Sequence, residues 1–272
     1  KNNFKRKIYI MYTLSNLTIP HGKIAIHWFE QNSFAIKGKS GKIILIDPFF
    51  PESRPSEVYV YQTSPVNPKD LQVDFVLFTH DHLDHTHVET VKNIFATSKF
   101  AKFAGPPESI NRITSKANIP AENCITITPN SKIEYLDVKI YSFYSKPPDG
   151  DKKANIPPPD TTHLGYVIKI DEKTLYFTGD CIRTLADHDE ILTAIKKLKP
   201  QIGFVVTHPT EGEFPFFEDT VKLAEKLNLE TIVPAHYSCF AKRNYDPLKF
   251  AEFFRNHKTK ALIIPYNSHV LI

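Results

Sequence analysis

Histidine and aspartate side chains are concentrated in one short stretch of this chain, residues 79–85, which reads Thr-His-Asp-His-Leu-Asp-His. The preceding residues, 73–78, are mostly apolar and contain no Gly or Pro, which is typical of a buried strand. Three imidazoles and their neighbouring carboxylates would be crowded and poorly satisfied at a strand end without a cation. A solvated His-rich loop is the alternative. The order of strand and then ligands favours a metal site, because it directs these side chains toward one point.

The residue types in this stretch restrict the metal. Imidazole nitrogens and carboxylate oxygens suit Zn, Mn or Fe, and the lack of Cys argues against a closed structural zinc site. The candidate ligands are His80, His82, Asp84 and His85. Asp81 lies between the first two histidines and is a candidate for a supporting or substrate-contacting role.

The spacing His-x-His-x-Asp-His resembles the signature of the metallo-β-lactamase fold superfamily. That family has three further ligands downstream, a His, an Asp after a Gly, and a second His, each beside a strand. His163, Asp180 and His236 occur here in that order, each next to a strand-like run. The resemblance extends over residues 22–265, nearly the whole chain.

The resemblance implies an α+β fold of the four-layer αββα sandwich type, in which two mixed sheets pack face to face with helices outside. The pattern of elements alone would indicate only an α/β or α+β protein. We expect residues 22–272 to form a single domain of this type, and residues 1–21 to be an N-terminal extension that is partly flexible.

The resemblance also implies two divalent metal ions, with zinc first and manganese or iron as alternatives. The first ion would be held by His80, His82 and His163. The second would be held by Asp84, His85 and His236, and Asp180 would bridge the two. A water shared by two such ions loses a proton near neutral pH and can attack a carbonyl or phosphoryl centre. Asp84 and Asp180 are therefore the catalytic candidates, while a capping or core role is the alternative for His163.

Four other residues are candidates around this site. Asp47 would support the metal by accepting a hydrogen bond from a ligand imidazole, although an Asp before a Pro is also a common turn residue. Arg183 and Tyr237 are candidate substrate contacts because they lie near Asp180 and His236 in the sequence. His208 ends a predicted strand, and both substrate contact and a structural role remain open for it.

Four segments, residues 103–107, 119–124, 178–180 and 233–236, resemble the branch of the family that contains L-ascorbate-6-phosphate lactonase. The expected function is therefore a metal-dependent hydrolase acting on a lactone, an ester or a phosphate-bearing small molecule, with an anionic substrate as one option. A nuclease or phosphodiesterase of the same fold, acting on RNA or nucleotides, is the alternative.

Composition bears on partners and compartment. The net charge is only +4, and no basic run with interleaved aromatic residues is present, so we expect no nucleic acid partner. No apolar run approaches the ~20 residues that span a bilayer, so we expect no membrane partner. The three Cys residues are scattered, which fits a reducing, cytoplasmic location. A homo-oligomer is suggested by the family alone.

The remaining sequence predicts alternating strands and helices. A segment with five prolines, residues 145–162, excludes a helix or a central strand and is either a linker or an ordered loop over the site. A second long loop is expected at 49–72. Strands are expected at 24–38, 42–46, 102–104, 124–128, 132–136, 137–144, 164–170, 174–178, 202–207, 231–235 and 261–264, and helices at 88–98, 108–117, 184–199, 217–227 and 246–257.

Overall fold

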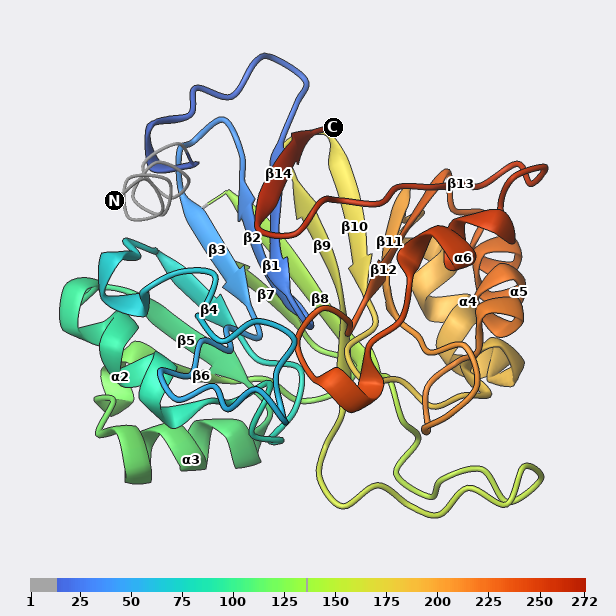
Figure 1. The fold of residues 1–272 in the computed structure, drawn as a ribbon, viewed down its shortest axis with the longest axis horizontal. Helices are drawn as coiled ribbons and strands as arrows, with labels where there is room; N and C mark the ends of the chain where they lie inside the picture. Colours follow the sequence, from blue (N-terminus) through green and yellow to red (C-terminus); the bar gives the residue numbers. More distant parts are fainter. Residues whose placement is uncertain (1–13, 136) are drawn as a thin grey trace. The chain divides into compact units, whose positions relative to one another are not determined.

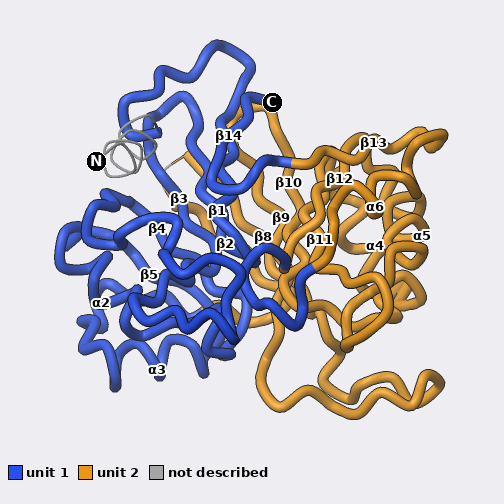
Figure 2. Tube along the Cα trace, viewed as in Figure 1, with its two compact units in different colours: residues 1–126, 237–244, 264–272 blue, residues 127–236, 245–263 orange. Residues whose placement is uncertain are grey.

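The computed structural model describes residues 14–135 and 137–272. The chain divides into two compact units, each built on one seven-stranded mixed sheet (Figures 1 and 2). Unit 1 contains Lys1–Thr126, Tyr237–Asn244 and Ile264–Ile272, and unit 2 contains Ile127–His236 and Tyr245–Ile263. Most of the expected N-terminal extension, residues 1–13, lies outside the described residues. The single-domain boundary at residue 22 stays a prediction.

The sheet of unit 1 combines an antiparallel and a parallel half. Its strands, in spatial order, are β14 (Ser268–Leu271), β1 (Ala25–Glu30), β2 (Ser33–Lys37), β3 (Ile43–Ile46), β4 (Phe75–Leu77), β5 (Lys102–Gly105) and β6 (Cys124–Thr126). The first four pair antiparallel and β3 to β6 pair parallel. Helices α2 (Val88–Thr97) and α3 (Pro107–Ala117) connect the parallel strands (Figure 1). Loops that follow parallel strands therefore emerge at one edge of this sheet.

The prediction of a single strand at residues 24–38 is wrong. Two strands, β1 and β2, form a hairpin there, and Gln31 takes a left-handed conformation (φ 52°) in the turn between them. The sequence marks the break by the polar run Glu-Gln-Asn-Ser at residues 30–33, without Gly or Pro, although every residue of both strands is buried. The hairpin expected around residues 38–41 is present between β2 and β3.

Unit 2 repeats this division into halves. In spatial order its strands are β13 (Lys260–Ala261), β12 (Thr231–Ala235), β11 (Ile202–Val206), β10 (Lys173–Phe177), β9 (Leu164–Ile170), β8 (Val138–Tyr144) and β7 (Lys132–Tyr135). Strands β10 to β13 pair parallel, and β7 to β10 antiparallel. The helices are α4 (Asp189–Lys197), α5 (Phe217–Leu227) and α6 (Pro247–Glu252).

Several element boundaries differ from the sequence expectations. The helix expected at 184–199 is a 3-10 turn followed by α4, which begins only at Asp189. Helix α6 ends at Glu252 instead of continuing to residue 257, and β13 has two residues. Strand β14 was not expected, because its partner β1 is more than 200 residues away in the chain. Residue 136, the expected end of one strand, lies outside the described residues.

The structure also contains short 3-10 turns and a hydrophobic core in unit 1. Among the described residues, 3-10 turns occur at Pro68–Asp70, Ala121–Asn123, Leu185–Asp187 and Ala241–Arg243. The main core of unit 1 gathers large side chains from its sheet and helices, among them Phe29, Phe50, Phe78, Val91 and Phe103. None of the helices formed by the described residues is both long and apolar enough to cross a membrane.

Candidate metal centre

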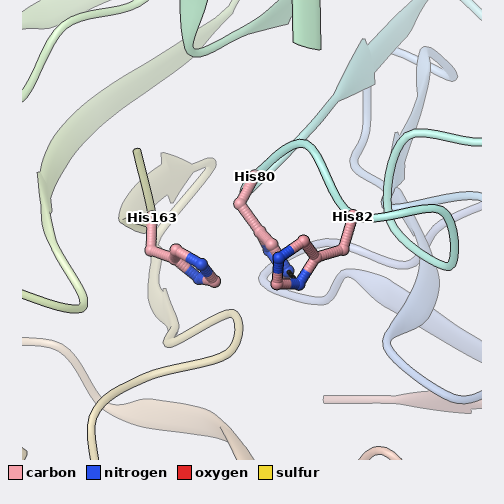
Figure 3. A group of neighbouring side chains, drawn as sticks. All are labelled: His80, His82 and His163. Atoms are coloured by element: carbon pink, nitrogen blue, oxygen red, sulfur yellow. Dashed lines mark hydrogen bonds between the residues drawn. The ribbon is translucent and has the colours of Figure 1, made fainter. Parts of the chain in front are cut away.

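Unit 1 presents four predicted ligands from the loop that follows β4. His80 Nε2 lies 3.0 Å from His82 Nδ1, and His85 Nε2 lies 3.5 Å from Asp84 Oδ2. The rings of His80 and His85 are also close, with centroids 4.0 Å apart. Figure 3 shows His80 and His82 on this loop with their rings turned toward each other. His80 and His85 are buried, whereas His82 and Asp84 are half-buried. The loop therefore gathers four donors and leaves two of them accessible to solvent.

A buried carboxylate, Asp47, orders this loop from the end of β3. Its oxygens accept hydrogen bonds from the Thr79 backbone N–H (2.7 Å), the Thr79 hydroxyl (2.6 Å) and His85 Nδ1 (2.7 Å). Because His85 donates its Nδ1 proton to Asp47, its Nε2 is the nitrogen that carries the lone pair in the neutral ring. These contacts are the ones that the predicted supporting role of Asp47 requires, and the role itself stays a prediction.

The same network sets the tautomer of His80. The Thr79 hydroxyl donates its only proton to Asp47, so at its 3.0 Å contact with His80 Nδ1 it must accept. His80 therefore carries its proton on Nδ1 and its lone pair on Nε2. A ring nitrogen fixed in this way is ready to bind a cation without rearrangement.

Two amides from the turn between β1 and β2 complete the network, and sequence analysis missed both. Gln31 Nε2 donates to Asp84 Oδ2 at 2.8 Å, and Asn32 Nδ2 donates to Asp47 Oδ2 at 2.7 Å. Adjacent amide side chains at a hairpin turn are a weak sequence signal. Their role becomes apparent only in the structure, where the turn contacts the ligand loop and Asp47.

Unit 2 presents the other three predicted ligands, one just before a strand and two shortly after strands. His163 immediately precedes β9, Asp180 follows β10 by three residues, and His236 directly follows β12. His236 Nε2 lies 3.5 Å from Asp180 Oδ1. His163, also labelled in Figure 3, places Nδ1 3.2 Å from the Asp180 backbone oxygen, so Nδ1 carries the proton and Nε2 the lone pair.

Three residues that position these groups have an unusual backbone. Gln31, Asp47 and His236 have φ values of 52°, 42° and 74°, in the left-handed region that non-glycine residues rarely adopt. Each such residue costs on the order of 1–3 kcal/mol and persists only where its surroundings impose it. Strain of this kind in both units is typical of functional sites.

The donors fit a metal of the expected kind. Two ligand atoms on a tetrahedral zinc at ~2.0–2.1 Å lie about 3.3 Å apart. The three close pairs, one imidazole pair and two imidazole–carboxylate pairs, are separated by 3.0, 3.5 and 3.5 Å. Within unit 1 the ligand atoms of His80 and His82, of His80 and His85, and of Asp84 and His85 lie within 4.8 Å of each other. Each unit therefore carries a cluster of His and Asp donors at ligand spacing.

The remaining candidates contact neighbours within their own units. Asp81 forms a two-point ion pair with Arg112, and Arg183 lies over the ring of Phe216. The Tyr237 ring stacks on Trp28 with centroids 4.4 Å apart, and burial raises the pKa of the Tyr237 phenol.

His208 caps the end of β11. Its Nδ1 accepts hydrogen bonds from the backbone N–H groups of Thr210 and Glu211, and its ring contacts Tyr245 edge-on. These contacts are those expected of a histidine with a structural role. Substrate contact by His208 stays a prediction.

The cysteines do not take part in these clusters. Burial raises the pKa of the Cys181 thiol to about 12, so it is neutral at physiological pH although it adjoins Asp180. Burial also raises the pKa of Cys239 strongly. A neutral, buried thiol is neither a good metal ligand nor a nucleophile.

Comparison with known families decides the classification. Residues 25–236 match the beta-lactamase superfamily domain. The chain belongs to this superfamily. Solved structures of the fold agree: a metallo hydrolase from Ignicoccus hospitalis superposes with a TM-score of 0.68 over 92% of this chain and 98% of its own, at 20% identity. An isothiocyanate hydrolase from Delia radicum gut bacteria gives a TM-score of 0.71 over 90% and 98%. The two mixed sheets with their helices confirm the fold class expected from the sequence.

Superfamily members with similar sequences carry names of two kinds. A "UPF0173 metal-dependent hydrolase" of Oenococcus oeni is 28% identical over 84% of this chain and 91% of its own length. A "Probable L-ascorbate-6-phosphate lactonase" of Escherichia fergusonii is 26% identical over 65% of this chain, but the match spans only 52% of that protein. The resemblance to the lactonase branch is therefore present but partial.

Proposed function

We propose that this protein is a metal-dependent hydrolase whose two clusters of donors form one dinuclear centre. In this proposal one ion is held by His80, His82 and His163, the other by Asp84, His85 and His236, and Asp180 bridges them. The observation that carries the proposal is the set of donor pairs at ligand spacing, in which His80, His85 and His163 already carry their lone pairs on Nε2. Membership of the superfamily and the names of its relatives point the same way.

In this proposal, different residues of the chain bind the ions and orient the ligands. Two divalent ions held there would supply Lewis acidity and lower the pKa of a shared water from ~15.7 toward ~7. Asp47 and Thr79 keep the imidazoles in the tautomer that binds a cation. Asp180 would hold both ions, and Asp84, which is half-buried, would be a ligand that solvent reaches in part. Zinc is favoured by intrinsic affinity, with manganese or iron set by cellular supply.

Unit 1 places an aromatic cluster near this ligand loop. The Phe49 ring lies 5.0 Å from the ring of His87 and 5.8 Å from that of Phe240, and Tyr59 lies 5.5 Å from Phe240. Burial raises the pKa of the Tyr59 phenol, and the nearby Asp84 carboxylate contributes in the same direction. Tyr59, His87 and Phe240 are half-buried, so their rings remain partly accessible. Such a surface suits an apolar or aromatic substituent of the substrate.

The guanidinium beside these rings is already committed to a partner. Arg54 lies over the Tyr59 ring at 4.5 Å, but its Nη2 donates to the buried Glu30 carboxylate at 3.0 Å. An anionic substrate would have to compete with that buried ion pair. We therefore favour an uncharged ester or lactone over a phosphate-bearing substrate, without nucleic acid or membrane as a partner. A cytoplasmic location and a homo-oligomer remain part of the proposal.

Metal analysis followed by a hydrolysis panel tests this function. We expect protein purified without chelator to carry up to two transition-metal ions per chain, to lose activity on chelation, and to regain it with zinc or manganese. The panel would contain aryl and alkyl esters, lactones, a sugar-phosphate lactone, isothiocyanates and phosphodiesters. Protein that neither retains nor takes up a stoichiometric metal would refute the proposal, whereas preferred cleavage of phosphodiesters would support the nuclease alternative.

A further inference from the structure

The turn between β1 and β2 brings one amide side chain onto a predicted metal ligand. Gln31 Nε2 lies 2.8 Å from Asp84 Oδ2, the same oxygen that lies 3.5 Å from His85 Nε2. Gln31 is 1% exposed and Asp84 is half-buried, so this hydrogen bond is partly shielded from competing water. An amide that donates to a carboxylate oxygen occupies one of its lone pairs and directs the others.

The backbone of Gln31 is held at both of its polar groups. Its N–H donates to the Tyr237 backbone oxygen at 3.0 Å, and its carbonyl accepts from Trp28 Nε1 at 3.1 Å. The residue adopts φ 52° although it is not glycine. Unit 1 therefore imposes a strained conformation on this position, and the result is a side chain aimed at Asp84.

The neighbouring residue shows that the turn acts on more than one carboxylate. Asn32 Nδ2 donates to Asp47 Oδ2 at 2.7 Å, and Asp47 in turn fixes Thr79 and His85. One turn of two amides thus contacts both the ligand Asp84 and the carboxylate that supports His85.

We propose that Gln31 is a positioning residue that holds Asp84 in its metal-binding orientation. This inference rests on the proposed function and adds a residue to it. Without the amide, the half-buried Asp84 side chain can rotate away, so the ion that it binds should be held less tightly. Loss of a hydrogen bond to a ligand typically lowers metal affinity ~10–100-fold, and we expect ~10-fold here because Asp84 is one donor of several.

Three substitutions separate the side-chain effect from the strained backbone. Gln31→Met has similar length and similar backbone strain but cannot donate a hydrogen bond. Gln31→Asn keeps an amide and tolerates a left-handed conformation better, yet it is one methylene too short. Gln31→Glu removes the donor but adds a carboxylate, so it shows whether negative charge at this position can replace the hydrogen bond. Gln62→Met, at an exposed position in unit 1, is the matched control.

The primary readout is metal retention, measured as zinc remaining on the protein across a chelator titration. The visible spectrum of the cobalt-substituted protein is the second, because it reports ligand geometry directly. We expect Gln31→Met and Gln31→Asn to release the weaker ion at ~10-fold lower chelator concentration and to alter the cobalt spectrum, and Gln62→Met to match the parent. kcat should fall while KM changes little, since the amide is placed to act on the ligand.

A double-mutant cycle with Asp84→Ala distinguishes positioning from general destabilisation. If Gln31 acts through Asp84, Gln31→Met should have no further effect on metal retention in the Asp84→Ala background. An equal loss in both backgrounds, or parent-like retention and spectrum for Gln31→Met, would overturn the inference. Failure of the parent protein itself to take up metal would instead refute the proposed function.

Discussion

The two units hold their donors in different ways. Unit 1 gathers four donors within residues 80–85 and orders them with side chains: Asp47, Thr79, Gln31 and Asn32 form a connected network. Unit 2 takes its three donors from three strand ends between residues 163 and 236. One supporting contact there is to the backbone, between His163 Nδ1 and the Asp180 carbonyl oxygen.

This difference separates two ways of arranging donor side chains. A short loop brings donors together at little cost in chain closure, but only supporting side chains can fix their tautomers and angles. Donors at strand ends are positioned by the sheet itself, whose ladder hydrogen bonds are insensitive to most side chains. Apart from the donors themselves, substitutions around the unit 1 donors should therefore lower metal affinity more than substitutions around the unit 2 donors.

The largest effect is expected at a unit 2 donor. Asp180→Ala should reduce activity on the order of 10³-fold or more and lower metal content, because Asp180 is the proposed bridge between the ions. Cys181→Ala, the adjacent control, should leave metal content unchanged because its thiol is neutral and buried. Metal stoichiometry and kcat/KM check both. If Cys181→Ala emptied the site and Asp180→Ala did not, the ligand assignment in unit 2 would be wrong.

A supporting residue of unit 1 should show the next largest effect. Asp47→Ala removes the acceptor of His85 Nδ1 and of the Thr79 hydroxyl, so both orientations are lost. We expect metal affinity to fall ~10–100-fold, measured by competition with a chromophoric chelator. Asp70→Ala, at an exposed carboxylate of the same unit, is the control. Equal affinities for the two variants would show that the unit 1 network is not needed for binding.

Acid should affect the sheet of unit 1 through His27, a fully buried residue of β1. Burial lowers the pKa of His27 from 6.5 to about 4, although its hydrogen bond to Asn267 opposes the shift. Between these values the unfolded chain binds a proton that the folded chain does not. Stability should therefore fall as pH drops from about 6.5 to about 4, by up to roughly 3 kcal/mol.

Denaturant unfolding at pH 7 and pH 4.5 measures this loss, and hydrogen exchange locates it. We expect earlier exchange in β1 and β14 of unit 1 than in β9 and β10 of unit 2. His27→Gln should flatten the pH dependence. A parent protein and a His27→Gln variant with the same pH profile would show that His27 does not control acid stability.

The smallest effect is expected in the proline-rich loop of unit 2, residues 145–162. Its tip is ordered by Asp151, which accepts from the Thr184 hydroxyl at 2.6 Å and pairs with Ile156 in an isolated bridge. Shortening the loop within Pro148–Pro158 should leave metal content nearly unchanged and raise KM on the order of tenfold or less. Loss of metal would show that the loop supports the unit 2 donors, and unchanged kinetics would place it away from the substrate.

The sequence predicted the donors better than their environment. His80, His82, Asp84 and His85 are recognisable because their spacing follows from one local loop after one buried strand. Helices α2 and α5 were predicted nearly to the residue, since apolar spacing and breaking residues mark them locally. The β1–β2 break was missed because its only sequence signal is the polar run at residues 30–33, which contains no Gly or Pro.

What the sequence determined by itself was the chemistry: imidazole and carboxylate donors in an order that implies a metal hydrolase of one superfamily. Tertiary structure decided which side chains support them. The pairing of Gln31 with Asp84 and of Asn32 with Asp47 joins residues that are 53 and 15 positions apart. Strand β14 likewise pairs with β1 through ladder hydrogen bonds, although the two strands lie near opposite ends of the sequence. Local spacing identifies the candidate ligands. Hydrogen bonds between distant segments depend on the folded backbone, because the sequence around an amide or an edge strand does not identify its partner.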